Sequence, residues 1–240
     1  MKIIKCENYQ EMSEKALEVI QELLKDVEKP VLGLATGSTP EGLYQEMIKA
    51  NEKGEMDFSD ICSVNLDEYV GIDPENEQSY HYYMKDHLFD HVNIKEENYN
   101  IPKADGDDLD KAVEEYNQLL DEIGRRNVQI LGIGNNGHIA FNEPDKTLSI
   151  GTRIVQLTDD TIEANSRFFD SPEEVPKKAI SMGIGDILNA DHIVLLANGK
   201  GKQKAIHQLI HTEELDPMFP ASFLKVHPSV FIIADKEALA

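Results

Sequence analysis

The sequence predicts an α/β fold, a single domain built on a doubly wound, mostly parallel sheet flanked by helices. Short runs dominated by apolar residues recur along the chain, and such runs are typical of strands that are buried on both faces. Helical patterns separate most of these runs, and 240 residues is a common size for one doubly wound domain. The runs span residues 31–35, 61–65, 127–131, 193–197 and 230–234.

The segments around these runs complete the pattern. We expect a short first strand over residues 2–6, then a helix over residues 9–26 in which apolar residues recur every three to four positions. An acidic amphipathic helix is expected over residues 107–123, directly before the strand at 127–131. The other expected elements are strands over residues 152–157 and 179–182 and helices over residues 40–49, over residues 158–168 and after residue 199.

The residues after the second strand have the composition of an anion-binding turn. Gly37, Ser38 and Thr39 lie between the strand and the expected helix, where backbone N–H groups and hydroxyls can converge on one ligand. Pro40 suits the first helical turn, and Ser38 or Thr39 is expected to cap it. A well-capped helix without a ligand is the alternative. The lysine of a nucleoside-triphosphate loop is missing, so a small phosphoester fits this turn better than ATP.

An acidic residue follows the third strand. Asp67 lies just beyond the run at residues 61–65, and open α/β sheets bind their ligands at the carboxyl ends of their strands. The sequence therefore makes Asp67 a candidate site residue, while an exposed turn carrying Asp67 and Glu68 is the alternative interpretation.

The strongest candidate for a site is the segment GIGNNGHIAFNEP, residues 132–144, which follows the strand at 127–131. Its glycines allow the backbone to approach a ligand closely. Asn136, His138 and Glu143 place an amide, an imidazole and a carboxylate within a few residues of one another. This combination predicts a reactive loop at a strand end.

The glycine spacing also satisfies the dinucleotide-binding fingerprint, Gly132-x-Gly134-x-x-Gly137. That fingerprint needs a helix to begin here, and Pro144 would interrupt such a helix. It also belongs to the first strand–helix unit of its domain, whereas this segment lies past the middle of the chain. The match is therefore weak.

Three further basic residues are candidates because the chain is otherwise acidic. Arg167 either pairs with a neighbouring carboxylate or clamps a phosphate with two hydrogen bonds. Lys200 and Lys202 lie at the expected start of a helix, where cations oppose the helix dipole. A bound anion would resolve that conflict.

The overall composition limits the possible partners. A net charge of −22 argues against nucleic acid, which requires clustered Lys and Arg. No apolar run approaches the ~18 residues of a spanning helix, and the first residues do not resemble a signal peptide, so we expect no membrane association and a cytoplasmic location. His87 and His91 are four residues apart but lack a third metal ligand at matching spacing, so no metal site is expected.

These motifs, taken together and in this order, resemble those of the glucosamine-6-phosphate deaminase family, in its short non-allosteric type. The resemblance covers nearly the whole chain, and the central loop and the ASFLKVHP stretch at residues 221–228 are its most specific parts. It implies a Rossmann-like fold of the deaminase, phosphogluconolactonase and ribose-5-phosphate isomerase type over residues 1–240. It also implies conversion of D-glucosamine 6-phosphate and water to D-fructose 6-phosphate and ammonia, in amino-sugar (N-acetylglucosamine) catabolism and without metal or cofactor.

The resemblance also assigns roles to the candidate residues. Asp67 becomes the base that moves the C2 proton of the opened sugar to C1. His138, oriented by Glu143 and Asn136, becomes the group that assists ring opening by proton exchange at the ring oxygen. The matching phosphate contacts are Gly37, Ser38, Thr39, Arg167 and Lys202.

Two departures from the family pattern carry expectations of their own. Some members have Asp where this chain has Asn136, and because a neutral amide exchanges no protons, Asn136 is assigned a hydrogen-bonding role. The longer, hexameric, allosterically activated members have a C-terminal extension and a lysine where this chain has Val155. We therefore expect a monomer or small homo-oligomer that N-acetylglucosamine 6-phosphate does not activate.

Three rival functions remain at this point. A 6-phosphogluconolactonase shares the Gly-x-Gly-x-x-Gly-His pattern, but the segment at residues 141–144 fits the deaminase. A sugar-phosphate sensor domain of a transcription regulator would carry a basic DNA-binding segment, which the acidic N-terminal region does not supply. A nicotinamide-dependent dehydrogenase, suggested by the glycines alone, would show a cofactor-dependent absorbance change.

Overall fold

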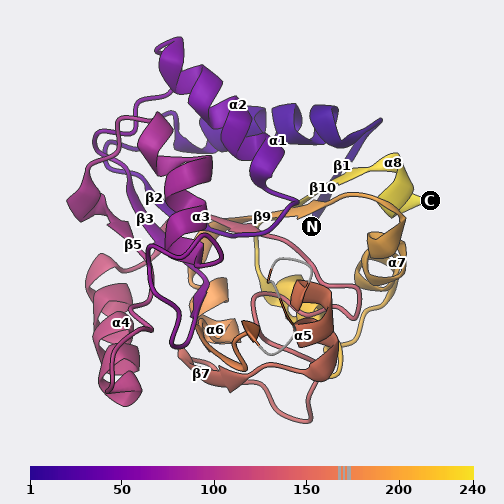
Figure 1. Ribbon diagram of the computed structural model, residues 1–240. Helices are drawn as coiled ribbons and strands as arrows, with labels where there is room; N and C mark the ends of the chain where they lie inside the picture. Colours follow the sequence, from indigo (N-terminus) through magenta and orange to yellow (C-terminus); the bar gives the residue numbers. More distant parts are fainter. Residues whose placement is uncertain (167–168, 170, 172–173) are drawn as a thin grey trace.

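The main sheet has seven strands, and every neighbouring pair in it is parallel. A computed structural model describes residues 1–166, 169, 171 and 174–240 (Figure 1). The strand order is β1-β10-β9-β6-β2-β3-β5. These strands are β1 (Lys2–Cys6), β2 (Val31–Leu34), β3 (Cys62–Asn65), β5 (Tyr99–Asn100), β6 (Arg126–Leu131), β9 (Ala190–Ala197) and β10 (Val230–Asp235).

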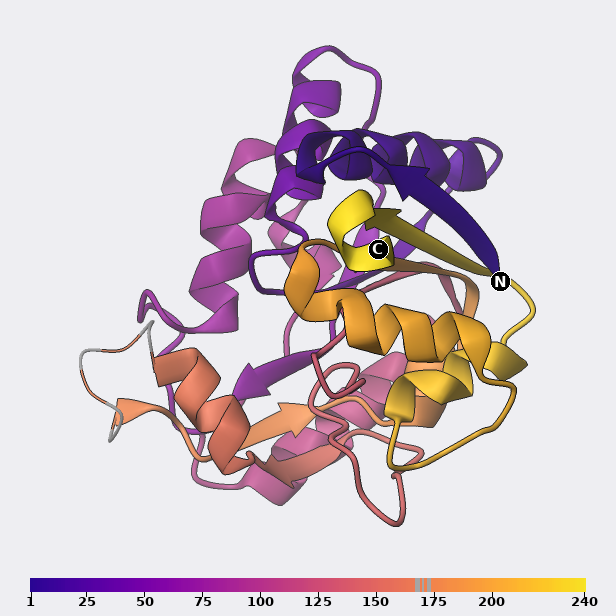
Figure 2. The ribbon, with the colours of Figure 1, turned by 90° about the vertical axis from the view of Figure 1, so that its right-hand side faces the viewer.

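Helices cover both faces of this sheet. In Figure 1, α1 and α2 lie above the sheet and α4, α6 and α7 lie below it, and Figure 2 shows α7 and α8 side by side. No helix in the described residues combines the length and apolar composition needed to cross a membrane. The α-helices are α1 (Tyr9–Leu24), α2 (Glu41–Glu52), α3 (Tyr80–His87), α4 (Leu109–Ile123), α5 (Asp159–Ser166), α6 (Ile184–Leu188), α7 (Gln203–His211) and α8 (Lys236–Leu239). Four described 3-10 helices are η1 (Phe89–His91), η2 (Glu96–Asn98), η4 (Lys200–Lys202) and η5 (Pro220–Val226).

The helix starts follow from local hydrogen bonding. The side chain of Asn8 accepts a hydrogen bond from the backbone N–H of Glu11 at the start of α1, and Asp108 accepts one from Lys111 at the start of α4. These caps satisfy N–H groups that have no partner within the first helical turn. Both helices were predicted from their apolar spacing, and their observed bounds agree within a few residues.

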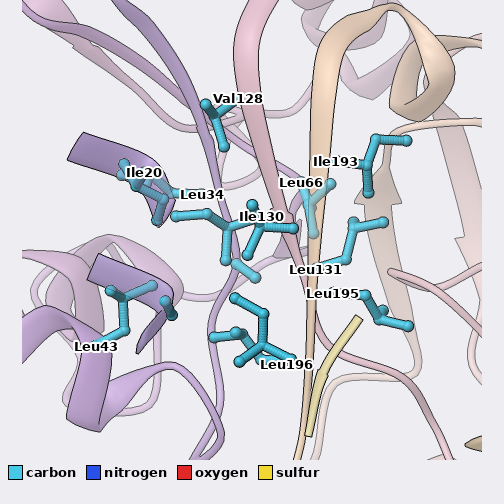
Figure 3. Packing of buried hydrophobic residues seen from close by; sticks show 14 of the residues in the cluster. Ile20, Leu34, Leu43, Leu66, Val128, Ile130, Leu131, Ile193, Leu195 and Leu196 are labelled. Atoms are coloured by element: carbon cyan, nitrogen blue, oxygen red, sulfur yellow. The ribbon is translucent and has the colours of Figure 1, made fainter. Parts of the chain in front are cut away.

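The core lies where the central strands meet the helices. Alternation along each strand sends successive side chains to opposite faces of the sheet. Figure 3 shows the result: Ile130 and Leu196 lie on the same side as Ile20 of α1, and Leu131 and Leu195 lie on the other side. All five side chains are almost completely buried. The apolar runs in the sequence therefore correspond to strands covered on both faces, as predicted.

A second, smaller sheet lies outside the main one. It has three antiparallel strands, β4 (Asp67–Tyr69), β8 (Lys178–Ser181) and β7 (Arg153–Gln156), in that order. The segments at residues 152–157 and 179–182 were predicted as strands, which is correct. They belong to this small sheet, however, and its third strand, β4, was not predicted.

The order of the strands determines where a ligand can enter. From β2 the chain continues to β3 and β5 on one side, and it then returns through β6 to β9 on the other side of β2. The crevice at such a reversal, at the carboxyl ends of the strands, is the usual ligand-binding position in open α/β sheets. The loops after β2, β6 and β9 all emerge at this edge because the three strands are parallel neighbours.

Candidate active site

The three loops at this edge contact one another. The hydroxyl of Thr39, in the loop after β2, donates a 2.9 Å hydrogen bond to Asn198 Oδ1, in the loop after β9. A Cβ placed on Gly201 would lie 3.6 Å from the side-chain oxygen of Asn135, in the loop after β6. Segments about 160 residues apart in sequence thus form one surface, as the strand-end hypothesis requires.

Asn136, His138 and Glu143 form a hydrogen-bonded relay within the loop after β6. Asn136 Oδ1 lies 2.8 Å from His138 Nδ1, and Asn136 Nδ2 donates a 2.8 Å hydrogen bond to Glu143 Oε2. The same Glu143 oxygen lies 3.3 Å from His138 Nδ1. The amide and the carboxylate both face Nδ1, so the other ring nitrogen, Nε2, is the one available for proton exchange with a ligand. The three residues predicted from the motif are therefore together.

The ionisation of Glu143 follows from these contacts. Burial alone would raise the pKa of Glu143, but the hydrogen bond and charge of His138, with hydrogen bonds from Thr161 and Asn136, lower it to about 2. Glu143 is consequently an anion across the physiological range. A fixed carboxylate beside an imidazole orients the ring, as in catalytic triads.

Two glycines let the loop pack closely, one against the relay and one against Phe219. A Cβ on Gly134 would lie 2.2 Å from the His138 ring, so only glycine lets the ring pack against the backbone there. Gly137 has a φ of +87°, and a Cβ on it would lie 2.1 Å from Phe219. The loop contains no helix, which agrees with its interpretation as a reactive strand-end loop and not a dinucleotide-binding turn.

The second half of the loop is attached to β8. Ala140 has a positive φ of 50°, a strained backbone conformation of the kind found at functional sites. Asn142 is fully buried, and its side chain donates hydrogen bonds to the carbonyls of Ile139 and Met182. The backbone N–H of Phe141 donates to the hydroxyl of Ser181 at 3.1 Å. These contacts fix the chain just before Glu143.

The same strand, β8, also pairs with the strand that carries Asp67. Asp67 begins β4 and is paired with Ser181 in the antiparallel register. Ser181 therefore contacts the reactive loop through its side chain and stands opposite Asp67 through its backbone. The small sheet is what brings Asp67, predicted from a strand end, to the same region as the relay.

Asp67 and Glu68 are both buried acids, which excludes the exposed-turn alternative. Burial, and to a smaller extent the negative charge of Glu68, raises the pKa of Asp67 to about 8. Glu68 accepts backbone hydrogen bonds from Tyr69, Tyr80 and His81, which oppose the effect of burial; even so its pKa rises to about 7. A carboxyl group with a pKa near neutrality is suited to accept and return a proton.

The predicted anion-binding turn adopts a conformation suited to that role. Gly37 has a φ of +99°, which favours glycine. The carbonyls of Gly37, Ser38 and Thr39 are held by tyrosine hydroxyls, Tyr83 bonding to the first and Tyr9 to the other two at distances of 2.7 to 3.1 Å. With these carbonyls turned toward tyrosines, Gly37 and Ser38 remain exposed to solvent.

The predicted cap of α2 was wrong. Pro40 itself occupies the N-cap position, and neither Ser38 nor Thr39 caps this helix. The Thr39 hydroxyl instead bonds to Asn198, because the turn is tied to the neighbouring loop and not folded back on the helix. In the first turn of α2, the Tyr9 hydroxyl accepts the N–H of Gly42 at 2.7 Å, so that group is occupied within the protein.

Of the two basic candidates Lys202 and Arg167, the structure describes only Lys202. Lys202 ends η4 and is partly buried, in the loop that also carries Asn198 and Gly201. Gly199, with a φ of +79°, anchors that loop because its N–H bonds to both carboxylate oxygens of Asp235. Arg167 lies outside the described residues.

Several residues of the site were not predicted. Tyr9, Tyr83, Thr161 and Ser181 all bond to the candidate loops from distant positions in the sequence, and no local pattern marks them. Within residues 1–166, 169, 171 and 174–240, no group of three or more His, Cys, Asp or Glu side chains is placed to hold a metal ion.

The chain is similar to known proteins along its whole length. The sequence model of the family described as glucosamine-6-phosphate isomerases/6-phosphogluconolactonase matches residues 5–232. A glucosamine-6-phosphate deaminase of Thermoanaerobacter pseudethanolicus is 50% identical over 238 residues, which cover 99% of this chain and 94% of the relative. One of Halothermothrix orenii is 49% identical over 240 residues, covering 99% and 98% of the two chains.

Solved structures give the same picture. A monomeric glucosamine-6-phosphate deaminase superposes with a TM-score of 0.95 at 42% identity, covering 99% of this chain and 98% of that one. A 6-phosphogluconolactonase of Thermotoga maritima has a TM-score of 0.77 at 19% identity, covering 98% and 99%, and it supports the fold alone. The predicted fold class is therefore confirmed. From its full-length match, its sheet and its sequence identity to these relatives, the chain belongs to the glucosamine-6-phosphate isomerase/6-phosphogluconolactonase family.

Proposed function

We propose that this chain is a glucosamine-6-phosphate deaminase, which converts D-glucosamine 6-phosphate and water to D-fructose 6-phosphate and ammonia. Relatives of this name that are about 50% identical over the full length support the proposal. The single observation that carries it is the relay of Asn136, His138 and Glu143, tied through β8 to a buried acid. These are the two kinds of group that an aldose–ketose proton shift on a cyclic sugar needs.

Ring opening is assigned to the relay. Opening the hemiacetal transfers a proton to the ring oxygen and removes one from the C1 hydroxyl, so it needs a group that both donates and accepts. His138 can do so through Nε2, while Asn136 and Glu143 hold Nδ1. Asn136 participates as a hydrogen-bonding group only, because an amide does not exchange protons at neutral pH.

The carbon proton transfer is assigned to Asp67. Its ionised form takes the C2 proton of the open-chain aldehyde while the aldehyde oxygen gains a proton, which gives an enolamine. The same carboxyl group then returns the proton to C1, and the amino nitrogen loses one proton, which leaves a hydroxymethyl group at C1 and an imine at C2. Water then adds to C2, and ammonia departs to give the ketone. Burial keeps the carboxyl group basic enough to take a proton from carbon.

The substrate phosphate is assigned to the turn after β2 and the loop after β9. Gly37, Ser38 and Thr39 supply backbone N–H groups and hydroxyls, and Lys202 supplies positive charge; Arg167 is retained from the sequence motif. The hydrogen bond between Thr39 and Asn198 holds the two loops together. In a chain of net charge −22, such local basic contacts are what allow an anion to bind.

The test of the proposal is product formation from glucosamine 6-phosphate with no added metal or nucleotide. Ammonia and fructose 6-phosphate should appear in equal amounts. Hydrolysis of 6-phosphogluconolactone should be assayed in parallel. Lactone hydrolysis without ammonia release would replace the proposal with the lactonase activity, and tight binding of the sugar phosphate without turnover would favour a sensor.

The ionisation of Asp67 predicts the effect of Glu68→Gln. Because the base must be ionised, kcat/KM of the wild type should rise with pH as it approaches about 8. The charge of Glu68 contributes to the raised pKa of Asp67, so removing it should move this acidic limb to lower pH. The measurement is the pH profile of kcat/KM, and an unshifted limb would contradict the coupling between the two acids.

We also propose that residues 1–240 act as one sugar-phosphate deaminase domain, in the cytoplasm and as a monomer. The structural relative at TM-score 0.95 is described as monomeric. Val155, in the position of the effector-site lysine of the allosteric members, is buried in a small apolar cluster with Tyr69 and Phe141. Sedimentation should give the mass of one chain. Rates should depend hyperbolically on substrate, with no response to N-acetylglucosamine 6-phosphate, and a sigmoidal curve made hyperbolic by that compound would overturn this.

A further inference from the structure

The carboxylate of Glu143 is held from two sides, and only one of them belongs to its own loop. Oε2 accepts the hydrogen bond from Asn136 and faces His138, as described above. Oε1 accepts a 2.5 Å hydrogen bond from the hydroxyl of Thr161, which lies on α5, 18 residues further along the chain. The Glu143 side chain is 12% exposed and Thr161 is 9% exposed, so water competes little for this contact.

The Thr161 hydroxyl is itself directed by a neighbour. Thr158, just before α5, has its hydroxyl oxygen 3.1 Å from the Thr161 hydroxyl, and it also accepts the backbone N–H of Thr161 at 3.3 Å. An ionised carboxylate only accepts hydrogen bonds, so the single proton of the Thr161 hydroxyl must point to Glu143. The bond from Thr158 then occupies the acceptor side of that hydroxyl. The order of donation is Thr158 to Thr161 to Glu143.

We propose that Thr161 is a positioning residue of the ring-opening relay, whose hydroxyl holds Glu143 in the orientation that fixes Asn136 and His138. A carboxylate bound on one oxygen alone can rotate about its terminal torsion, which has a broad energy minimum. The second contact, from a helix outside the loop, removes that freedom. The hydroxyl also stabilises the anionic form of Glu143, the form that orients the imidazole.

This inference rests on the proposed deaminase function, and Thr161→Val tests it. Valine has nearly the same shape and lacks the hydroxyl. Hydrogen bonds to charged groups are among the stronger ones in proteins, so losing the bond from Thr161 to Glu143 should lower kcat by about 10- to 100-fold. KM should change little, because Thr161 is not among the proposed phosphate contacts. Thr161→Ser keeps the hydroxyl and should restore most of the activity.

Two readouts separate positioning from a general structural effect. The hydrogen bond from Thr161 lowers the pKa of Glu143, so Thr161→Val should raise that pKa, which NMR titration of the carboxyl group measures independently of the rate. Binding of 2-amino-2-deoxyglucitol 6-phosphate, an open-chain compound that needs no ring opening, should be unchanged. Weaker binding of this probe by Thr161→Val would mean that the substitution disturbs the whole site, and the inference would fail.

The chain provides a matched control. Thr152 is also a buried threonine whose hydroxyl donates to a carboxylate, at 2.8 Å from Asp186 Oδ2. Thr152→Val should lower the stability to denaturant without moving kcat or the pKa of Glu143. If Thr161→Val behaves in the same way, Thr161 is merely structural. If the wild type itself releases no ammonia, the proposed function fails. If the wild type is active and Thr161→Val is equally active, only the inference about Thr161 fails.

Discussion

Asp67→Asn should lower the rate of ammonia release by at least the ~10²–10⁴-fold that general acid–base groups typically contribute. The amide has almost the shape of the carboxyl group but cannot take a proton from C2. The other buried acid nearby, Glu68, is adjacent in β4, and since side chains alternate along a strand, the two point to opposite faces. Glu68 therefore cannot substitute as the base, and no single phosphate contact should be as costly to remove.

Stability provides the control for this variant. Because burial raises the folded-state pKa of Asp67 to about 8, its protonated form is favoured in the folded protein. The free energy of unfolding therefore falls as the pH rises from the unfolded-state value of about 4 toward the folded one. Asparagine carries no charge, so the variant should be at least as stable as the wild type at pH 7 in a urea titration. An inactive variant that is also less stable would not establish Asp67 as the base.

His138→Gln should produce the second large loss, also about 10²–10⁴-fold in kcat. Glutamine can still form hydrogen bonds with Asn136 and Glu143 but does not shuttle protons at neutral pH. Ring opening should then limit the rate. The open-chain probe 2-amino-2-deoxyglucitol 6-phosphate should bind as tightly as before, because it does not require that step.

Deuterium at C2 of the substrate distinguishes the two variants. In His138→Gln, C–H cleavage follows the slow ring opening, so the isotope effect on kcat should fall toward one. Any residual turnover of Asp67→Asn should instead retain a full isotope effect, because proton removal is then the slow step. Equal isotope effects in both variants would contradict the assignment of separate steps to His138 and Asp67.

Much of this arrangement follows from local sequence. The central strands of the main sheet were predicted because burial on both faces leaves a short run of apolar residues, as at residues 193–197 in β9, whereas the two-residue edge strand β5 was not predicted. The relay was predicted because Asn136, His138 and Glu143 lie close together in sequence, and their contacts depend on one loop. In both cases the interacting groups are near neighbours along the chain.

The rest depends on pairings that a local pattern does not contain. β4 has only three residues, and it pairs with residues of β8 that lie 110 to 114 positions further along the chain. Nothing near Ser181 or Thr161 in sequence indicates that their hydroxyls bond to the reactive loop. The cap of α2 was mispredicted for the same reason, because a distant asparagine, Asn198, attracts the Thr39 hydroxyl.

The position of β8 has a consequence for how this site can change over evolution. One four-residue strand sets the spacing between the groups proposed for ring opening and for carbon proton transfer, since Ser181 contacts the reactive loop and pairs with Asp67. A substitution that displaces β8 alters both steps at once, and a change in either loop cannot compensate for both. New substrate preferences should therefore arise more readily through the turn after β2 and the loop after β9, which can vary without altering that spacing.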